Sequence, residues 1–452
     1  MLPERFESRM KNMLGDSYAD FYRELTLGSA VRGFRLNRLK YDGDENIGIP
    51  SSPLDYVKDG YIINGDSRGI GNTPVHHSGM IYIQDPGAMA SAAALDIRPG
   101  MWIADLCAAP GGKSTQAASL LENRGFILSN EFVPKRAKIL VGNFERMGIR
   151  CGMVTSLDTK EIAKLFDSVF DIVIADAPCS GEGMFRKDVP AIEEWSEENV
   201  TLCRERQISI LNNAAGIVKR GGKLLYSTCT YSIEENESVV DEFLDTHPDY
   251  RLAEVNESLR GATADGIVFT GAKCRELYKC RRFYPHVSKG EGQFLALLER
   301  TEADEGRILY KESVKTPTKD QSAIISAFFR DNMTRVPDGR IIMQGDTAIL
   351  LPHGCPIPPR GVFLNGVLIG EIRGKNLFPS HQLFSAYGRE FVRRVELPDD
   401  DAAKYLSGEE ITARAGLNNG WCSLLYKGAA IGGGKISCGV IKNHYPKGLR
   451  VR

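Results

Sequence analysis

The sequence predicts an α/β protein with a doubly wound, mainly parallel central sheet and a smaller β-rich domain at its carboxyl end. Three observations support this prediction. Between residues 101 and 300, short apolar runs alternate with amphipathic segments, as strands joined by helical crossovers do. Beyond residue 301, short β-like runs are separated by Gly and Pro turns, which is typical of a small β domain. The 452 residues are enough for two or three domains, each with its own core.

Five apolar runs are expected to form the strands of the central sheet. They read WIADL, FILSN, CGMVT, DIVIAD and KLLYST, at residues 102–106, 126–130, 151–155, 171–176 and 223–228. Residues 191–218 are long and periodic enough for a helix, and Ser232 with Glu235 gives a capping-box pattern ahead of a helical run over 234–247. The Gly-containing segment 287–292 lies between two strand-like runs, which predicts an antiparallel hairpin at the sheet edge.

The chain is expected to divide into four parts. Residues 1–95 form a front module with a helical run over 4–14, 96–300 form the central α/β domain, 301–320 form a charged linker, and 321–452 form the β-rich domain. No internal repeat or low-complexity tract is found in the sequence.

The composition excludes several classes of protein. Lys and Arg total 57 against 58 for Asp and Glu, so a polyanionic partner would have to meet local basic patches. No apolar run approaches the roughly 20 residues of a membrane helix, and the amino terminus is charged where a signal peptide would be apolar. We therefore expect a cytoplasmic protein. The ten cysteines include no C-x-x-C pair, which favours reduced thiols and no metal site.

Residues 102–121 have the pattern of a nucleotide cradle. A strand is followed by a small-residue loop with Gly111 and Gly112 and then by a helix, whose free N–H groups favour a polar ligand. The loop matches neither the dinucleotide fingerprint nor the Walker pattern, and a Gly pair alone is equally typical of a tight strand–helix turn. Glu131 favours the interpretation as a ligand-binding loop. It ends the next predicted strand, 19 residues beyond Gly112, where an acid can accept hydrogen bonds from ribose hydroxyls.

Acidic residues follow three consecutive strands. Glu131, Asp158 and Asp176 each lie at or just after a strand end, and the carboxyl ends of strands are where open α/β sheets bind ligands. Single acids at such positions are usually caps or turn residues. Three in succession indicate a binding site.

The motifs of this region resemble those of one enzyme family. They read DLCAAPGGKS, NEFVPKR, DAPCSGEGMFR, YSTCTYSIEENE and RRFYPHVSKGEGQFLALL. In this order they resemble the RNA cytosine-5 methyltransferases of the NOL1/NOP2/sun type, which use S-adenosylmethionine. The resemblance implies a Rossmann-like class I methyltransferase fold, an RNA substrate and a PUA-like RNA-binding carboxyl-terminal domain. The chain length and the ending KISCGVIKNHYPKGLRVR resemble bacterial members that modify 16S ribosomal RNA.

Two cysteines follow neighbouring predicted strands, Cys179 in DAPCSGEG and Cys229 in YSTCTYS. Carbon C5 of cytosine becomes nucleophilic only when a group adds to C6, and a thiolate does this well. One thiol is enough for the attack. The resemblance implies that Cys229 is the nucleophile and that Cys179 assists product release. Alone, either cysteine would more often be a small buried hydrophobe.

The resemblance also implies the remaining site residues. Asp176 would bond the N3/N4 edge of the base, and Lys113 would reach the same base. The residues expected at the cofactor are Cys107, Ala108, Ala109, Pro110, Gly111, Gly112, Lys113, Glu131, Arg136, Asp158 and Asp176.

The target cytosine must be single-stranded or flipped out of its stack before a thiol can reach C6. Basic residues at both ends of the chain are candidate RNA contacts: Arg32, Arg35, Arg38, Lys40, Lys442, Lys447, Arg450 and Arg452, with Tyr445 available for stacking. Such clusters are more often solvated faces. His76 and His77 lack ligand-like neighbours in the sequence and are expected to be surface turn residues.

Three alternatives stay open at this point. The substrate could be transfer RNA, or the chain could be an RNA-binding assembly factor that keeps the fold without turnover. A nicotinamide-dependent dehydrogenase would share the sheet, but the sequence lacks the glycine fingerprint of that class. Intact Cys179, Cys229, Asp176 and Lys113 favour a methyltransferase.

Overall fold

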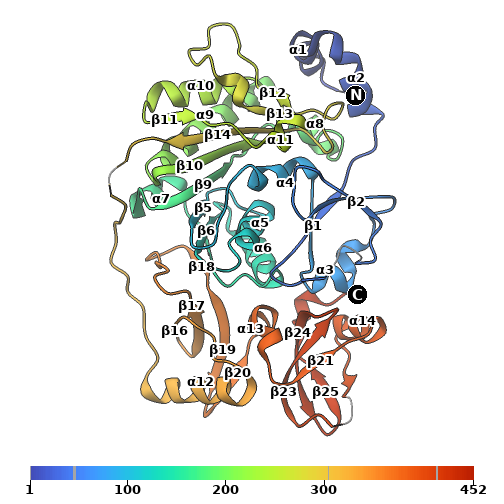
Figure 1. The fold of residues 1–452 in the computed structure, drawn as a ribbon, viewed down its shortest axis with the longest axis vertical. Helices are drawn as coiled ribbons and strands as arrows, with labels where there is room; N and C mark the ends of the chain where they lie inside the picture. Colours follow the sequence, from blue (N-terminus) through green and yellow to red (C-terminus); the bar gives the residue numbers. More distant parts are fainter. Residues whose placement is uncertain (1, 44–46, 304, 414–415, 452) are drawn as a thin grey trace.

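The computed structural model describes residues 2–43, 47–303, 305–413 and 416–451, and a large mixed sheet lies within its central region (Figure 1). The strands of this sheet are β5 (Trp102–Asp105), β6 (Phe126–Asn130), β7 (Gly152–Thr155), β9 (Phe170–Asp176), β10 (Val218–Thr228), β11 (Tyr250–Leu252), β12 (Ala264–Asp265), β13 (Arg281–Phe283), β14 (Gln293–Arg300) and β18 (Val362–Asn365). The five strands expected from the apolar runs are confirmed as β5, β6, β7, β9 and β10.

The order of the strands creates a crevice beside β5. Across the sheet the order is β12-β13-β14-β10-β9-β5-β6-β7-β18, and β11 also pairs with β14. The strands from β10 to β7 are parallel, whereas β14 is antiparallel to β10 and β18 to β7. The chain leaves β5 toward β6 on one side and later enters β9 on the other. The carboxyl ends of β5 and β9 therefore meet at a switch point, where open α/β sheets bind ligands.

Helices cover both faces of the sheet because its strands are apolar on both sides. The helices of this region are α4 (Pro86–Ala93), α5 (Gly112–Leu120), α6 (Pro134–Arg146), α7 (Thr159–Leu165), α8 (Val189–Glu193), α9 (Glu197–Ala215), α10 (Glu237–Thr246) and α11 (Glu257–Gly261). Ile103 packs in one buried cluster with α5 and α6, and its neighbour Ala104 packs in the other with α7 and α9. This alternation confirms the doubly wound class that the sequence predicts.

Two local predictions need correction. The segment after Ser232 is not a complete capping box: Ser232 Oγ accepts from the Glu235 N–H, but the Glu235 carboxylate bonds Ser180 and Gln207, and α10 begins only at Glu237.

Strands β13 and β14 do form an antiparallel pair, but β14 lies inside the sheet between β10 and β13. The two-residue strand β12 pairs beyond them and forms the edge.

The front module adds a four-stranded antiparallel sheet and a helical pair. Its elements are α1 (Glu4–Leu14), α2 (Tyr18–Thr26), β1 (Gly33–Leu36), β2 (Ser51–Pro53), β3 (Gly60–Ile63), α3 (Pro74–His77) and β4 (Ile81–Gln84), with strand order β2-β3-β1-β4. The helix expected over residues 4–14 is confirmed. Phe6 and Phe21 of the helical pair pack with Phe185, Trp195 and Tyr231 beside the two cysteine loops.

The carboxyl-terminal region contains two further sheets, which confirms its β-rich character. Its elements are α12 (Lys319–Asn332), β16 (Arg340–Gln344), β17 (Thr347–Leu351), β19 (Val367–Arg373), β20 (Asn376–Pro379), α13 (His381–Tyr387), β21 (Arg394–Glu396), α14 (Asp399–Ser407), β22 (Ile411–Thr412), β23 (Gly420–Tyr426), β24 (Ala429–Ser437) and β25 (Val440–Asn443). Strand β18 from this region extends the central sheet. Before α12, β15 (Arg307–Ile308) pairs with β8 (Phe166–Asp167), so the charged segment is anchored to the central region. None of the helices in the described ranges is long and apolar enough to cross a membrane.

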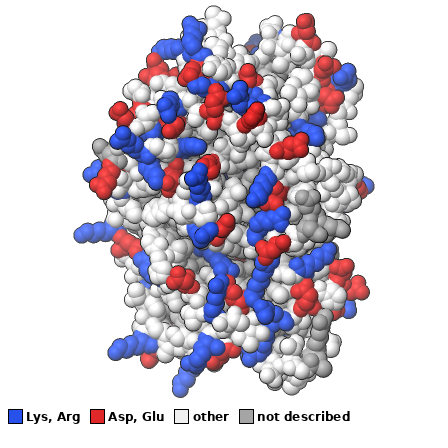
Figure 2. Space-filling view, viewed as in Figure 1, with Lys and Arg blue, Asp and Glu red and all other residues white. Residues whose placement is uncertain are grey.

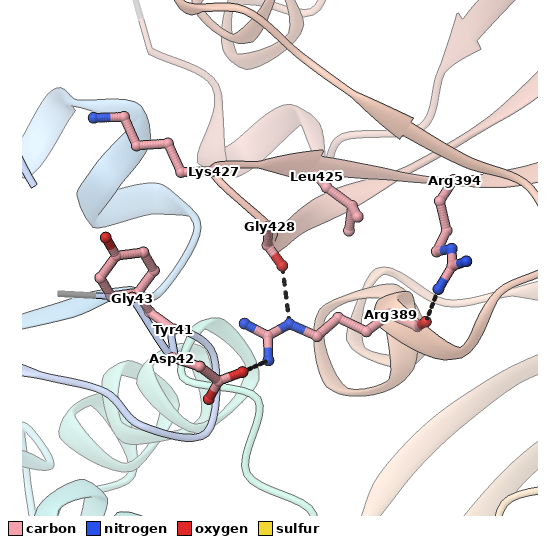
Figure 3. A pocket seen from close by; sticks show the side chains of 8 residues that line it. All are labelled: Tyr41, Asp42, Gly43, Arg389, Arg394, Leu425, Lys427 and Gly428. Atoms are coloured by element: carbon pink, nitrogen blue, oxygen red, sulfur yellow. Dashed lines mark hydrogen bonds and ion pairs between the residues drawn. The ribbon is translucent and has the colours of Figure 1, made fainter.

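A buried lysine joins the front module to the carboxyl-terminal region. Lys40 is 4% exposed, and its Nζ donates to the Ser385 carbonyl and hydroxyl oxygens and to the Ala430 carbonyl, at 2.7, 2.9 and 2.7 Å. Burial, helped by the nearby Arg389, lowers the pKa of Lys40 well below its ordinary value. Figure 3 shows Arg389 beside this junction, where it bonds Asp42 at 2.6 Å and the Gly428 carbonyl at 2.9 Å. The front module and the carboxyl-terminal region are thus held together by polar contacts.

We predict that Lys40→Met lowers the free energy of unfolding by about 2 to 4 kcal/mol, because two buried carbonyl oxygens and a hydroxyl lose their donor. Urea unfolding of the full chain measures this change. Lys58→Met, at an exposed lysine of the same module, is the control and should change stability little. An equal effect of the two substitutions would contradict the structural role of Lys40.

Candidate active site

The loop between β5 and α5 is held in a shape that only glycine tolerates at one position. Gly111 has φ +116°, and a Cβ there would lie 2.8 Å from Leu140 Cδ1. Arg136 Nη2 donates to the Ala109 carbonyl and Asn143 Nδ2 donates to the Pro110 carbonyl, both at 2.8 Å. The loop is therefore fixed by the helix α6 that follows the next strand.

A cavity of ≈ 300 Å³ opens at the switch point between β5 and β9. It is lined by Tyr82, Ile83, Gln84, Asp85, Ala88, Asp105, Cys107, Ala108, Ala109, Pro110, Gly112, Lys113, Asp176, Met184, Cys229, Glu291, Gly292 and Gln293. The structure thus brings most of the predicted cofactor loop together with Lys113, Asp176 and Cys229. Gly111, Glu131, Arg136 and Asp158 are not among the residues that line this cavity.

Of these four residues, three make contacts of their own outside the cavity. Glu131 is buried at the end of β6, where its Oε1 accepts from the Val133 N–H and its Oε2 pairs with Arg136 at 3.2 Å. Arg136 therefore links Glu131 to the loop between β5 and α5. Asp158 is exposed and caps α7 by accepting from the Lys160 N–H. The roles of these three residues at a cofactor stay predictions.

Asp105 is a site residue that the sequence reasoning missed. It ends β5, it is 1% exposed, and its Oδ2 accepts from Ser114 Oγ at 2.6 Å. Its Oδ1 is buried and has no hydrogen-bond partner, and burial raises the pKa of Asp105 to about 7. The rule that acids gather at strand ends would have found it, because it ends the first strand of the same series.

Asp176 and Lys113 form an ion pair on the floor of the cavity. Lys113 Nζ lies 2.7 Å from Asp176 Oδ2, and Ser227 Oγ donates to Asp176 Oδ1 at 2.6 Å. Lys113 is 8% exposed, so it does not point freely into solvent. Both carboxylate oxygens of Asp176 are therefore oriented before any base enters.

The two cysteines touch each other, but only one lines the cavity. Their sulfur atoms lie 3.1 Å apart, and the Cys229 N–H donates to Cys179 Sγ at 3.3 Å. Cys229 lines the cavity with Asp176 and Lys113, whereas Cys179 is absent from its lining. The hydrogen bond to Cys229, together with burial, raises the pKa of Cys179 well above its ordinary value. Cys179 is thus held as a thiol behind Cys229.

Two buried glutamates that the sequence reasoning did not assign to the site hold the cysteine loops. Glu235 accepts from the Ser180 N–H and from Gln207 Nε2, both at 2.9 Å, and burial raises its pKa to about 7. Glu182 accepts from Trp195 Nε1 at 2.9 Å and from the Tyr231 N–H at 3.1 Å. Their positions in the sequence, within polar motifs, gave no signal of burial.

Several of the candidate RNA contacts are buried, which corrects the prediction made for them. Arg35, Lys40 and Tyr445 are 2%, 4% and 4% exposed. Each packs against another part of the chain and forms a hydrogen bond there, with Thr115, Ser385 and His77 respectively. Arg32, Arg38, Lys442 and Lys447 are exposed and Arg450 is half-buried; Arg452 lies outside the described residues. The four exposed residues and Arg450 stay candidate RNA contacts.

The prediction for the histidine pair also needs correction. His76 and His77 are half-buried in α3, and His77 Nδ1 lies 2.7 Å from the Tyr445 hydroxyl oxygen. Within the described ranges, no group of three or more His, Cys, Asp and Glu residues is arranged to hold a metal ion. His77 therefore contributes to the contact between the front module and the carboxyl-terminal region.

The parallel sheet, the Gly-containing loop and the cavity at the switch point define a Rossmann-like fold with a ligand-sized cavity, and comparison with solved structures assigns this fold to the Rossmann-like methyltransferases. The chain is similar to the crystal structure of a methyltransferase homologue from Pyrococcus horikoshii, with 28% identity and a TM-score of 0.58 over 66% of this chain and 95% of that one. The structure of NSun6 from the same organism shares the fold at 20% identity, with a TM-score of 0.55.

Comparison of sequences identifies the family. A family described as 16S rRNA methyltransferase RsmB/F matches residues 92–299, the N-terminal domain of 16S rRNA methyltransferase RsmF matches 2–86, and the methyltransferase RsmF PUA domain matches 392–451. Ribosomal RNA small subunit methyltransferase F of Shewanella oneidensis is 30% identical over 92% of this chain and 90% of its own length, and that of Vibrio vulnificus is 29% identical over 99% and 97%. The chain belongs to the ribosomal RNA small subunit methyltransferase F family.

We predict that Asp105→Asn changes how stability depends on pH. The folded-state pKa of about 7 exceeds the ordinary value of 3.8, so the folded protein binds the proton more tightly than the unfolded chain does. The stability of the wild type relative to Asp105→Asn should therefore fall as pH rises from about 4 to 7, by a few kcal/mol in all. Thermal unfolding at pH 5 and pH 8 measures the difference. Asp346→Asn, at an exposed turn, should show no such trend, and parallel curves for wild type and Asp105→Asn would contradict the assignment.

Proposed function

We propose that this protein transfers a methyl group from S-adenosylmethionine to C5 of a cytosine in 16S ribosomal RNA, with Cys229 as the nucleophile. The observation that carries the proposal is the arrangement of the two sulfurs. Cys229 lines the cavity together with Asp176, Lys113 and the loop after β5, while Cys179 lies behind it as a thiol. One reactive thiol beside both a base pocket and a cofactor loop is what methylation at C5 requires.

The residues present fit the cofactor. Asp105 Oδ1 is a buried acceptor without a partner, which suits the ammonium group of a methionyl moiety. Glu131 directly follows β6, where an acid suits ribose hydroxyls. Cys107 to Pro110 and Gly112 line the cavity and would lie against the rest of the molecule. When bound, S-adenosylmethionine supplies an electrophilic methyl group on a sulfonium centre.

The reaction steps follow from these positions. The Cys229 thiolate adds to C6 of the cytosine, and the electron pair of the C5–C6 double bond becomes available at C5. Asp176, oriented by Lys113 and Ser227, bonds the N3/N4 edge, and protonation of N3 through this contact offsets the negative charge that the addition pushes into the ring. C5 takes the methyl group as the methyl–sulfur bond of the sulfonium breaks, which leaves a neutral thioether. A base then removes the C5 proton, and the electron pair of that C–H bond re-forms the C5–C6 double bond as the C6–S bond breaks and the Cys229 thiolate leaves.

Cys179 is suited to the last step. Its thiol is in contact with Cys229 and keeps its proton at neutral pH, because its pKa is raised. A proton donor at 3.1 Å stabilises the sulfur as it leaves C6. This role explains why a reaction that needs one nucleophile is accompanied by two adjacent thiols.

The choice of RNA rests on the family and on the carboxyl-terminal domain. The relatives named above are small subunit ribosomal RNA methyltransferases, and residues 392–451 match a PUA domain of the same family. This supports a ribosomal rather than a transfer RNA substrate. We place the reaction in the cytoplasm, where ribosomal RNA is present.

We predict that Cys229→Ala loses methyl transfer completely but still binds S-adenosylmethionine, and that Cys179→Ala accumulates a covalent protein–RNA adduct that survives denaturation. The reason is that the first variant cannot add to C6, whereas the second adds but releases slowly. Bisulfite sequencing of 16S ribosomal RNA from cells that carry each variant, with gel analysis of the adduct, measures both effects.

Cys438→Ala removes an exposed thiol that lies outside the cavity and should behave as wild type. Adduct formation by Cys229→Ala but not by Cys179→Ala would reverse the roles of the two cysteines. Unchanged 16S ribosomal RNA methylation in cells without this protein would overturn the proposed substrate.

We further propose that RNA phosphates contact the basic surface at the junction of the front module and the carboxyl-terminal region. A hollow of ≈ 480 Å³ lies there, and its charged lining residues are Arg389, Arg394, Lys427 and the acidic Asp42. Arg394 and Lys427 are exposed, and Figure 3 shows them on either side of Arg389. On the side of the molecule drawn in Figure 2, Lys and Arg are mixed with Asp and Glu. The positive charge available to RNA is therefore local, as the near-zero net charge requires.

We predict that the double variant Arg394→Glu/Lys427→Glu raises the KM for 16S ribosomal RNA by about 10-fold and lowers the slope of log Kd against log salt by about 1 to 2. The kcat should change little, because neither residue lines the active-site cavity. A matched double charge reversal on α12, Lys319→Glu/Arg330→Glu, serves as the control at exposed positions away from this hollow. Equal losses in the two double variants would show that only total charge matters.

A further inference from the structure

Gln293 is a buried polar side chain of the active-site cavity for which the reaction above has no use. It begins β14, it is 5% exposed, and it lines the cavity that contains Cys229. Its Nε2 is buried without a hydrogen-bond partner. The other buried glutamines, at positions 84, 116, 207 and 382, each make at least one side-chain hydrogen bond. Gln293 is the exception among the buried glutamines of the described ranges.

An unpartnered amide is an unfavourable choice for a packing role. A buried donor without an acceptor destabilises the folded state, and a methionine of similar shape would fill the same space without that loss. The Cβ of Gln293 lies close to α4, because a Cβ placed on Gly87 of that helix would be 3.4 Å from it. The aliphatic part of the side chain therefore already packs there, and packing does not require the amide. The polar end of the side chain therefore lacks a role within the free protein.

The strand register places Gln293 beside the nucleophile. Strands β10 and β14 are antiparallel, and their last paired residues at this end are Thr228 and Phe294. Continuing this register by one residue brings Cys229, which directly follows β10, opposite Gln293, the first residue of β14. The two are therefore cross-strand neighbours at the cavity. On the other side of β10 lies β9, which ends in Asp176. Asp176 and Gln293 thus flank Cys229 from neighbouring strands on opposite sides.

This flanking arrangement matches the shape of a pyrimidine. In cytosine, the N4 amino group and the O2 carbonyl lie on opposite sides of the line that joins C6 to N3. With C6 at Cys229 and the N3/N4 edge at Asp176, the O2 atom is directed toward the side of β14. O2 is an acceptor, and a half-turn of a carboxamide lets its NH2 group face the cavity as a donor.

We propose that Gln293 donates a hydrogen bond to O2 of the target cytosine, as a residue that binds the base and stabilises the addition step. This inference rests on the proposed function. Addition of Cys229 to C6 moves negative charge onto the ring, including O2, so a donor at O2 bonds the transition state more strongly than the substrate. Gln293 then contributes to kcat as well as to base binding, and the buried amide gains the partner that it lacks in the free protein.

The test compares two substitutions of nearly equal size with the wild type, using full-length protein and a 16S ribosomal RNA transcript. Gln293→Met keeps the shape and loses all hydrogen bonding, while Gln293→Glu keeps the acceptors and loses the donor. Both should lower kcat by about 10- to 100-fold. Calorimetric binding of S-adenosylmethionine should be unchanged in both, and the melting temperature of Gln293→Met should be equal to or above that of the wild type. Gln344→Met, at an exposed glutamine of β16, is the control and should keep wild-type kcat.

Each alternative outcome is distinct. A Gln293→Met variant with wild-type kcat, or one whose loss comes with a lower melting temperature and weaker cofactor binding, would overturn the inference while the proposed function stands. Loss in Gln293→Met with full activity in Gln293→Glu would overturn the assignment of a donor at O2. Binding of the cofactor without methyl transfer by the wild type would overturn the proposed function, and this inference with it.

Discussion

The active site depends on the parallel pairing of β9 with β10. In this register Asp176 lies opposite Ser227, and the turns after the two strands then bring Cys179 and Cys229 into contact. The same register allows Ser227 to orient Asp176, which in turn pairs with Lys113. A slip of one residue would turn these side chains to the other face of the sheet. The positions of the proposed nucleophile, of the second thiol and of the oriented carboxylate therefore follow from a single strand pairing.

Parts of the chain far apart in sequence close the cavity around this centre. The turn after Cys179 carries Arg186 and Lys187, which pair with Glu291 beside β14, and Lys187 also pairs with Asp85 at the start of α4. The front module thus supplies one wall through Asp85, and the antiparallel end of the sheet supplies another through Glu291. The partly closed cavity is expected to exclude bulk water, which strengthens hydrogen bonds to a developing charge.

Much of the fold and of the chemistry could be predicted from local sequence. The apolar runs gave the strands, and the resemblance gave Cys179, Cys229, Asp176 and Lys113, which the structure places together. Burial and long-range pairing could not be predicted in the same way. Arg35 and Lys40 looked like an RNA-binding surface because a basic run gives no sign of the partners that bury it. Gln293 gave no signal either, since its position opposite Cys229 follows from the register of two strands more than 60 residues apart. The division of the chain at residues 95, 300 and 320 stays a prediction.

The identity of the cysteine that bonds to RNA tests the central claim most directly. RNA that contains 5-fluorocytidine cannot lose a proton from C5 after methyl transfer, so the covalent adduct with the wild-type protein persists. Mass spectrometry of the digested adduct then locates the modified peptide. The account predicts that the nucleotide is attached at Cys229 and carries a methyl group. Attachment at Cys179, or a trapped complex without any bond to cysteine, would contradict it.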